Sequence, residues 1–293
     1  MKAIFYLSLA AILWGLNFHL AKLMLSETHF LEAGFWRFLF AVIPLLLLAY
    51  SGLPSWEVIR KNILGIGLVG VISLFGFNIF FFTGMMNSPA INGALIISVT
   101  PILTILLSRI MLKTPLERNQ IIGAVISLFG VAFLIMKGKL DNVLQLGFSS
   151  SDLLLLGASL FFALQNVWIK QYGDAMSNKN FTFLTNLCCL LCFVLVLPFS
   201  GIEASPSLSL PYWGAAIGIG FLGTSVAYFC WNLGVQLTSA NQASIFGNLT
   251  PLSTAVFSIL LGERLYSYHF ISGVIIILGV IVLRSKRPKL SKA

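Results

Sequence analysis

The sequence has few charged residues. Only 9% of its 293 residues are Asp, Glu, Lys or Arg, 58% are hydrophobic, and the mean hydropathy is +0.96. A soluble domain usually carries about 25% charged residues, and this chain has too few charges to cover a water-facing surface. The composition therefore excludes an ordinary soluble domain and predicts an integral membrane protein.

Charge is absent over eight long windows. Six of them can each hold one membrane-spanning helix of about 20 residues, and the two longest can each hold two. Turn-forming clusters break these two longest windows, at Asn87-Ser88-Pro89 and at residues 238–241. We therefore predict ten spans, from the windows 3–21, 38–56, 62–108, 119–136, 153–169, 180–202, 204–262 and 265–283.

Several motifs are also missing. No small-x-small cleavage site follows the first apolar run, so residues 3–25 are expected to stay as the first helix. The chain has no HExxH, no GxSxG, no paired acidic cluster and no ATP-binding motif. We therefore expect no enzyme activity, no cofactor and no bound metal. The four cysteines all fall inside predicted spans, so we expect no disulfide.

One segment is written twice. NGALIISVTP at 92–101 matches QASIFGNLTP at 242–251, and an ungapped overlay of 84–128 on 234–278 gives ten identities. The order of windows (one span, one span, two spans, one span) also occurs twice. These matches predict an internal duplication. We divide the chain into a first five-helix repeat at 1–137, a linker at 138–151, a second repeat at 152–284 and a basic tail at 285–293.

Five is an odd number of spans, so the second repeat must enter the membrane from the opposite side. With the N-terminus in the cytoplasm, thirteen of the 18 Lys and Arg residues fall on the cytoplasmic side and four outside. The predicted fold class is an all-α integral membrane protein of ten transmembrane helices in two inverted five-helix repeats (5+5). Both termini are predicted to be cytoplasmic.

The net charge of +9 is explained by this topology and the basic tail. A cluster of Lys and Arg directly after the last span can contact the headgroups of membrane lipids. We therefore expect no nucleic-acid partner.

Polar side chains within the spans are the candidate site, because a polar group in hydrocarbon needs a partner or a wet cavity. The first span carries Trp14, Asn17 and His19, and the sixth carries Gln165 and Asn166 at the equivalent depth. His19 either hydrogen-bonds a neighbouring helix or contacts the substrate or a proton. The two amides either line a cavity or join helices.

The third, fourth, eighth and ninth spans add Asn78, Ser98, Tyr228, Trp231 and Asn248. A pseudo-twofold axis would bring such residues to one cavity near the membrane midplane. We predict that they bind substrate together with the five residues above. The aromatic side chains can equally be packing bulk.

Two prolines in the repeated segments leave a further question open. Pro101 and Pro251 each free a backbone carbonyl one turn earlier, near Ile97 and Gly247. These carbonyls either face the substrate or are satisfied by threonine side chains at a structural kink.

No acidic residue is predicted at mid-membrane. A drug/proton antiporter commonly needs a buried carboxylate there, so proton coupling, if present, would use His19. Arg37 lies inside the second span, where it pairs with Glu32, snorkels toward the membrane surface or contacts an anion.

The residues WGLNF at 14–18 with Lys22, FWRFLFA around Arg37, the Thr-Pro segments, and LLGERL at 260–265 followed by Gly273 resemble the EamA family of the drug/metabolite transporter (DMT) superfamily. The resemblance covers essentially the whole chain. It implies a ten-helix carrier of small metabolites in the bacterial inner membrane, often an exporter of amino acids or related compounds. The Glu263/Arg264 pair has no counterpart in the first repeat, and we expect it to be a structural helix end.

We therefore predict a secondary transporter that moves an amino acid or amino-acid-like compound outward by alternating access. The proton is a candidate coupling ion. Alternative substrates are a nucleoside-like metabolite such as S-adenosylmethionine, or a range of drugs. A channel or assembly subunit and a lipid-modifying membrane enzyme are alternatives from other functional classes.

Overall fold

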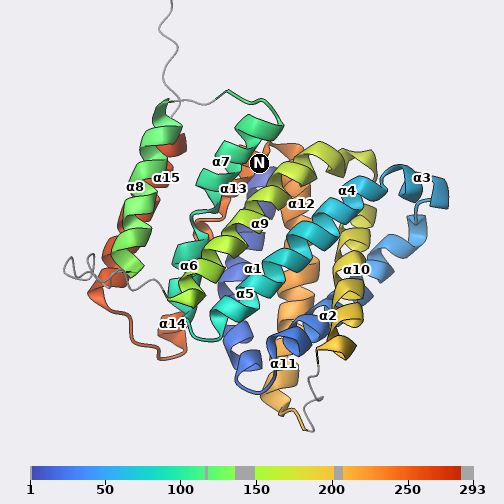
Figure 1. The fold of residues 1–293 in the computed structure, drawn as a ribbon, viewed down its shortest axis with the longest axis horizontal. Coiled ribbons are helices and arrows are strands. Elements are labelled where there is room, and N and C mark those ends of the chain that lie inside the picture. The colour runs from blue at the N-terminus through green and yellow to red at the C-terminus, as the bar shows by residue number, and fades with distance from the viewer. Residues whose placement is uncertain (1, 116–117, 136–148, 201–206, 285–293) are drawn as a thin grey trace, which may run out of the picture.

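The computed structural model describes residues 2–115, 118–135, 149–200 and 207–284 (Figure 1). Every regular element in these ranges is a helix. The first half contains α1 (Lys2–Leu25), α2 (Phe30–Ala49), η1 (Tyr50–Gly52), α3 (Trp56–Lys61), α4 (Ile63–Gly67), η2 (Leu68–Phe75), α5 (Gly76–Met85), α6 (Ala90–Ile97), α7 (Thr100–Met111) and α8 (Arg118–Ile135). The second contains α9 (Ser150–Tyr172), η4 (Gly173–Ala175), α10 (Asn178–Val196), η5 (Leu197–Phe199), α11 (Leu210–Gly220), η6 (Phe221–Val226), α12 (Ala227–Leu237), α13 (Ala240–Phe246), α14 (Leu249–Leu260) and α15 (Ser267–Arg284).

Eight helical stretches are long and apolar enough to cross a membrane. They are Lys2–Leu25, Phe30–Gly52, Ile63–Met85, Ala90–Met111, Ser150–Ala175, Asn178–Phe199, Leu210–Leu237 and Ala240–Leu260. The predicted fifth and tenth spans fall on α8 and α15, whose apolar stretches Ile121–Gly130 and Ser267–Gly279 are shorter. The prediction of an all-helical membrane protein is confirmed for the described residues, and eight of the ten predicted spans have the required length.

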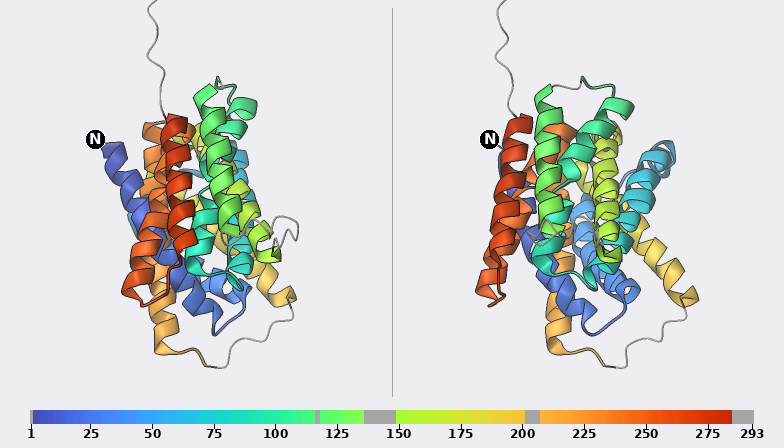
Figure 2. Two further views of the ribbon diagram at one scale, coloured as in Figure 1. Left: turned by 90° about the vertical axis from the view of Figure 1, so that its left-hand side faces the viewer. Right: turned by 60° about the vertical axis from the view of Figure 1, so that its left-hand side comes forward.

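Helices α8 and α15 pack side by side at one edge of the bundle (Figures 1 and 2). The Ser127 hydroxyl donates to the Ile276 carbonyl at 3.2 Å. A Cβ atom placed on Gly279 would meet the Ser127 hydroxyl at 2.3 Å, so these backbones approach as closely as glycine allows.

Two spans contain a π-helical turn at mid-length. η2 lies between α4 and α5, and η6 lies between α11 and α12. In η6 the hydroxyl of Thr224 donates to the carbonyl of Ile219, five residues earlier, at 2.8 Å. Such widened turns leave backbone groups to other partners and occur frequently at functional sites.

Both Thr-Pro segments interrupt a span. The break between α6 and α7 precedes Pro101, and the break between α13 and α14 precedes Pro251. The Thr100 hydroxyl donates to the Ile97 carbonyl at 2.7 Å. At the first kink, the carbonyl that Pro101 frees is therefore satisfied by the neighbouring threonine. In the second, the Gly247 carbonyl accepts the Thr250 backbone N–H at 3.0 Å.

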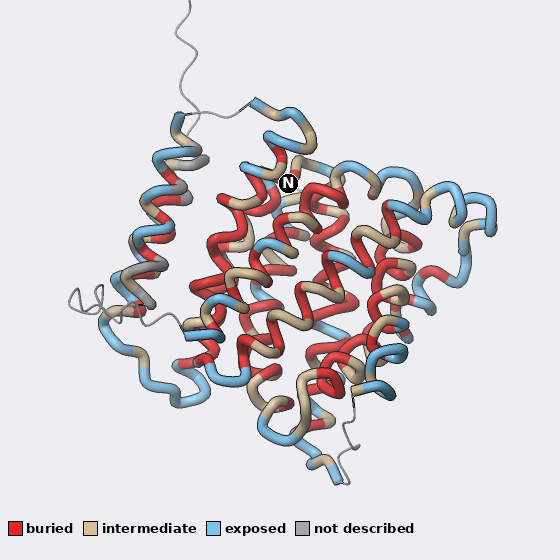
Figure 3. The backbone as a smooth tube through the Cα atoms, viewed as in Figure 1, coloured by how far each residue is buried: buried red, intermediate tan, exposed pale blue. Residues whose placement is uncertain are grey.

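Buried residues concentrate in the middle of the bundle, and the outer helix faces are exposed (Figure 3). The exposed residues include large apolar side chains such as Leu47 and Leu195. An apolar outer face suits a protein surrounded by lipid. The polar residues of the interior are therefore the part of the molecule that needs a functional explanation.

Candidate functional site

A cavity of about 540 Å³, a volume that includes its open part, lies where the two broken spans meet α1, α2, α5, α9 and α12. Aromatic side chains form much of its wall, and no acidic side chain lines it. Its lining residues are Trp14, Asn17, Phe18, Arg37, Phe77, Phe81, Ala94, Ile97, Ser98, Thr100, Pro101, Phe162, Tyr228, Gly247 and Thr250. A mostly apolar cavity with a few polar groups is the usual form of a small-molecule site.

Trp14 is the centre of the aromatic wall. Its ring centroid lies 5.1 Å from that of Phe162, 5.4 Å from that of Tyr228 and 4.8 Å from that of Trp231. These rings come from α1, α9 and α12, so one cluster joins both halves of the chain. Edge-to-face and tilted pairs of this kind hold aromatic rings in fixed orientations.

The glycine of η6 positions two cavity residues. The Trp14 indole N–H and the Asn17 side-chain amide both donate to the Gly223 carbonyl, at 3.0 and 3.1 Å. A Cβ on Gly223 would lie 1.8 Å from Asn17 Oδ1, so only glycine fits. Asn17 Oδ1 is buried against the Gly223 backbone and has no hydrogen-bond partner among the described residues.

Asn166 joins three helices behind the aromatic wall. Its Oδ1 accepts the Trp231 indole N–H at 2.8 Å, and its amide donates to the Thr104 hydroxyl at 3.3 Å. Both side chains that it contacts are themselves buried. Asn166 therefore ties α9 to α12 and α7, as expected for a polar group that joins helices.

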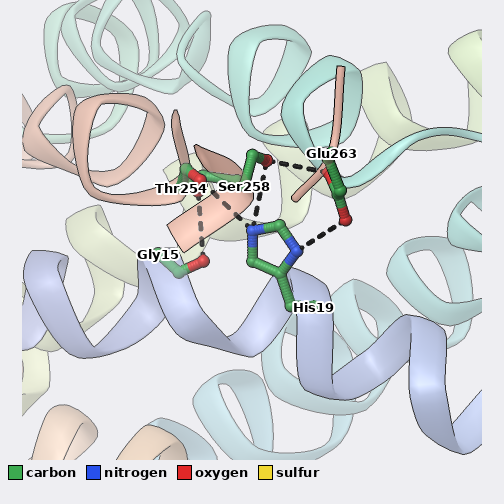
Figure 4. A network of polar contacts seen from close by, with 5 residues as sticks. All are labelled: Gly15, His19, Thr254, Ser258 and Glu263. Carbon is green, nitrogen blue, oxygen red and sulfur yellow. Dashed lines mark hydrogen bonds and ion pairs between the residues drawn. The ribbon is translucent and has the colours of Figure 1, made fainter. Parts of the chain in front are cut away.

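His19 points from α1 toward the end of α14 (Figure 4). Its Nδ1 lies 3.0 Å from Glu263 Oε1, and its Nε2 lies 3.2 Å from the Thr254 carbonyl. The Ser258 hydroxyl donates to Glu263 Oε2 at 2.8 Å. We call these residues, with Gly15, the His19 network.

Arg37 reaches the cavity from α2 and is almost fully buried. Its Nε donates to the Thr224 hydroxyl of η6 at 2.9 Å. Among the described contacts Arg37 does not pair with Glu32, so that expectation is wrong. The Glu32 carboxylate instead accepts from Thr28 and from the Trp36 indole. Trp36 lies one turn further along α2, and Thr28 lies just before the helix begins.

The EamA-like transporter family model matches the chain twice, over residues 1–136 and 149–285. The chain belongs to this family.

Individual relatives span nearly the whole chain. The uncharacterized transporter YyaM of Bacillus subtilis (strain 168) is 30% identical over 275 residues, covering 92% of this chain and 90% of that protein. A probable amino-acid metabolite efflux pump of Escherichia coli (strain K12) is 25% identical over 295 residues, covering 94% and 92%. A protein of known crystal structure superposes with a TM-score of 0.74 at 17% identity, over 96% of this chain and 97% of that one, which supports the fold.

In this EamA-like transporter, four of the ten predicted site residues line the cavity: Trp14, Asn17, Ser98 and Tyr228. Two more, Trp231 and Asn166, form the layer behind its aromatic wall. His19 lies on the α1–α14 interface rather than on the cavity surface.

The remaining three predicted residues are buried, but they are not among the residues that line the cavity. The amides of Asn78 and Asn248 donate to carbonyls of their own helical segments, those of Leu74 and Ile245, at 2.8 and 3.2 Å. Gln165 is fully buried, and neither of its amide atoms has a hydrogen-bond partner among the described residues. The polarity of a mid-span residue alone did not indicate which way its side chain turns.

Sequence reasoning missed several cavity residues. Phe77 lies on an almost entirely apolar helix, where no hydrophobic contrast separates the cavity face from a lipid face. Glu263 was expected to be a structural helix end, yet it contacts His19, which is 244 residues away in the chain. No motif spacing could reveal that contact.

No metal centre is evident in the part of the chain that the structure describes, since three or more His, Cys, Asp or Glu side chains do not gather there. Outside the spans, Glu27 joins the first loop to the start of α11. Its carboxylate accepts the Ser209 hydroxyl at 2.5 Å and the Ser209 N–H at 2.9 Å. These hydrogen bonds lower the pKa of Glu27.

Proposed function

We propose that this EamA-like transporter is a secondary carrier that exports an amino acid or amino-acid-like compound by alternating access. The observation that carries this proposal is the cavity at the meeting point of two broken spans. Discontinuous helices at a midplane site are a recurring feature of such carriers. The name of the E. coli relative, a probable amino-acid metabolite efflux pump, supports the substrate class and the direction.

The proposed topology has ten spans in two inverted repeats of five, with both termini in the cytoplasm of a bacterial inner membrane. α1 starts at the face marked N in Figure 2, whereas α9, in yellow-green, ends at that face. The opposite directions of these two helices support the inversion. The double match of the family model and the charge bias support the repeat and the orientation.

The cavity chemistry supports a small substrate with an apolar or aromatic body. Trp14, Phe81 and Tyr228 offer ring surfaces to such a body.

We further propose that the proton is the coupling ion and that the His19 network binds it. Both ring nitrogens of His19 face oxygen acceptors, and a neutral imidazole can donate only one hydrogen bond. The protonated ring satisfies both acceptors. The other charged group near this pair is Lys22, which interacts with Glu263 across the same interface.

Counterflow in proteoliposomes tests the carrier. Vesicles loaded with unlabelled amino acids should take up a labelled amino acid transiently, and unlabelled analogues should compete. Trp14→Leu should abolish the uptake, while Trp56→Leu, at an exposed site on α3, serves as the matched control. Uptake that does not saturate, or that survives Trp14→Leu in correctly inserted protein, contradicts the proposal.

A further inference from the structure

Arg37 is a rigidly held cation inside the cavity. The Thr224 hydroxyl accepts from its Nε at 2.9 Å and itself donates to the Ile219 carbonyl at 2.8 Å. The guanidinium carbon lies 5.7 to 5.9 Å from the ring centroids of Phe38, Phe81 and Phe82. One edge of the guanidinium is therefore anchored, and its orientation is set by the surrounding rings.

The other edge of this guanidinium has no anionic partner. The ion pair found among the described residues is His19–Glu263, and no acidic side chain lines the cavity. The side-chain hydrogen bond that Arg37 makes to the described residues is the one from its Nε to Thr224. An arginine remains protonated in a protein, so it cannot avoid this burial by losing its charge.

The chain's internal repeat shows that the helix crossing itself does not need an arginine. Helix α2 crosses the junction of α11 and η6, where a Cβ on Gly220, the last residue of α11, would lie 2.8 Å from the Arg37 carbonyl oxygen. At the equivalent crossing, a Cβ on Gly70 of η2 would lie 2.6 Å from the carbonyl oxygen of Thr185 on α10. The Thr185 hydroxyl turns back to the Phe181 carbonyl of its own helix at 2.8 Å.

A buried, oriented and unpaired guanidinium fits a ligand better than it fits a structural role. Guanidinium groups match the planar geometry of a carboxylate, which can accept two parallel hydrogen bonds. The negative charge of a carboxylate compensates the positive charge of Arg37, for which no acidic side chain is available among the described lining residues.

We propose that Arg37 binds the carboxylate of the transported compound, which makes the substrate a carboxylate with an apolar or aromatic body. This inference rests on the proposed carrier function and specifies its substrate. Amines without a carboxylate should not bind at this site.

Ligand-induced thermal stabilisation of the purified full-length protein tests this assignment without requiring transport. The probes are matched sets in which one aromatic or branched body is presented as the amino acid, as its decarboxylated amine and as its deaminated acid. At least one amino acid or acid should raise the melting midpoint, and its matched amine should not. Amines that stabilise as well as their acids, or no stabilisation by any carboxylate, overturn the proposal.

Variants separate a binding role from a structural one. Arg37→Gln should lose the carboxylate response but melt without ligand at or above the wild-type midpoint, because an unpaired buried charge is removed. Thr185→Gln, at the equivalent crossing, should keep the response. If Arg37→Gln does not fold, Thr224→Val, which frees the Arg37 Nε, should weaken the carboxylate response by several-fold; an unchanged response overturns the assignment.

These outcomes distinguish this inference from the carrier proposal. A carboxylate-specific shift without counterflow would reject the carrier and keep the Arg37 site. Counterflow that amines inhibit as well as acids do would keep the carrier and reject the site.

Discussion

The α1–α14 and α9–α7 interfaces are equivalent positions in the two repeats, and they are built differently. At the first, His19 contacts the Thr254 carbonyl at 3.2 Å and Glu263 at 3.0 Å. At the second, the position of His19 is taken by Val167, and the buried Ser108 hydroxyl has no hydrogen-bond partner. Both repeats have this serine, as Ser108 and as Ser258, but the ionisable pair of His19 and Glu263 occurs at the first interface alone among the described residues.

The same contrast recurs at the α2–η6 and α10–η2 crossings. The close glycine contacts occur in both copies, whereas Arg37 has Thr185 as its counterpart. A residue that is needed to pack a repeated pair of helices should occur in both repeats. A residue that binds one substrate or one proton is needed in one repeat only. We infer that departures from the repeat mark the transport chemistry and that shared residues mark the scaffold.

Gly223→Ala should have the largest effect. Its Cβ would overlap Asn17 Oδ1 and break the bonds that orient Trp14 and Asn17, at a cost of about 3 kcal/mol or more in the free energy of unfolding. The counterpart Ser73 already carries a side chain, so Ser73→Ala should cost about 1 kcal/mol or less. Unfolding titrations in detergent measure both, and equal losses would contradict the comparison.

His19→Val, which copies the residue of the other repeat, should come next. It removes the hydrogen bonds to Glu263 and to the Thr254 carbonyl and should cost about 2 kcal/mol. Counterflow should lose its dependence on the proton gradient, because the proposed proton-binding ring is gone. Val167→Leu is the control. A gradient dependence that His19→Val leaves unchanged would contradict the proposed role of His19.

Gln165→Leu should have a smaller effect of opposite sign. Its two amide atoms are buried without partners, so an apolar side chain of similar size should stabilise the fold by about 1 to 2 kcal/mol. The counterpart Asn17 donates to Gly223, so Asn17→Leu should destabilise it. Thermal midpoints in the same detergent decide the signs. Destabilisation by Gln165→Leu would indicate that this amide has an unseen partner.

Glu27→Gln should have the smallest effect. Hydrogen bonds from Ser209 hold the pKa of Glu27 below its ordinary value. The contact therefore stabilises the folded protein at pH values above the ordinary pKa of a glutamate. This stabilisation is lost as the pH falls through the lowered pKa of Glu27. Melting midpoints of the wild type and Glu27→Gln should differ slightly at neutral pH and converge in acid. A difference that persists in acid would contradict this origin.

Much of the helical framework follows from charge-free windows and turn residues. The breaks predicted at residues 87–89 and 238–241 coincide with the ends of α5 and α12. Pro101 and Pro251 mark the interrupted spans, since proline removes a backbone donor. The π-helical turns η2 and η6 were not predicted, because no residue pattern distinguishes them from α-helix.

The site was predicted only in part, for a physical reason. Polarity indicated Asn17 and Ser98, which line the cavity, but it equally indicated Asn78, which bonds to its own helix. Arg37 was left between three interpretations, because its partner depends on tertiary packing. Contacts between residues far apart in the chain decide which polar groups remain free for a ligand.

Counterflow by Arg37→Thr tests the central claim most directly. This substitution gives the first repeat the residue of the second and leaves the glycine contact of the crossing in place. Correctly inserted Arg37→Thr should lose counterflow of a carboxylate substrate, while Thr185→Val keeps it. Wild-type counterflow by Arg37→Thr would show that this departure from the repeat is not part of the transport chemistry.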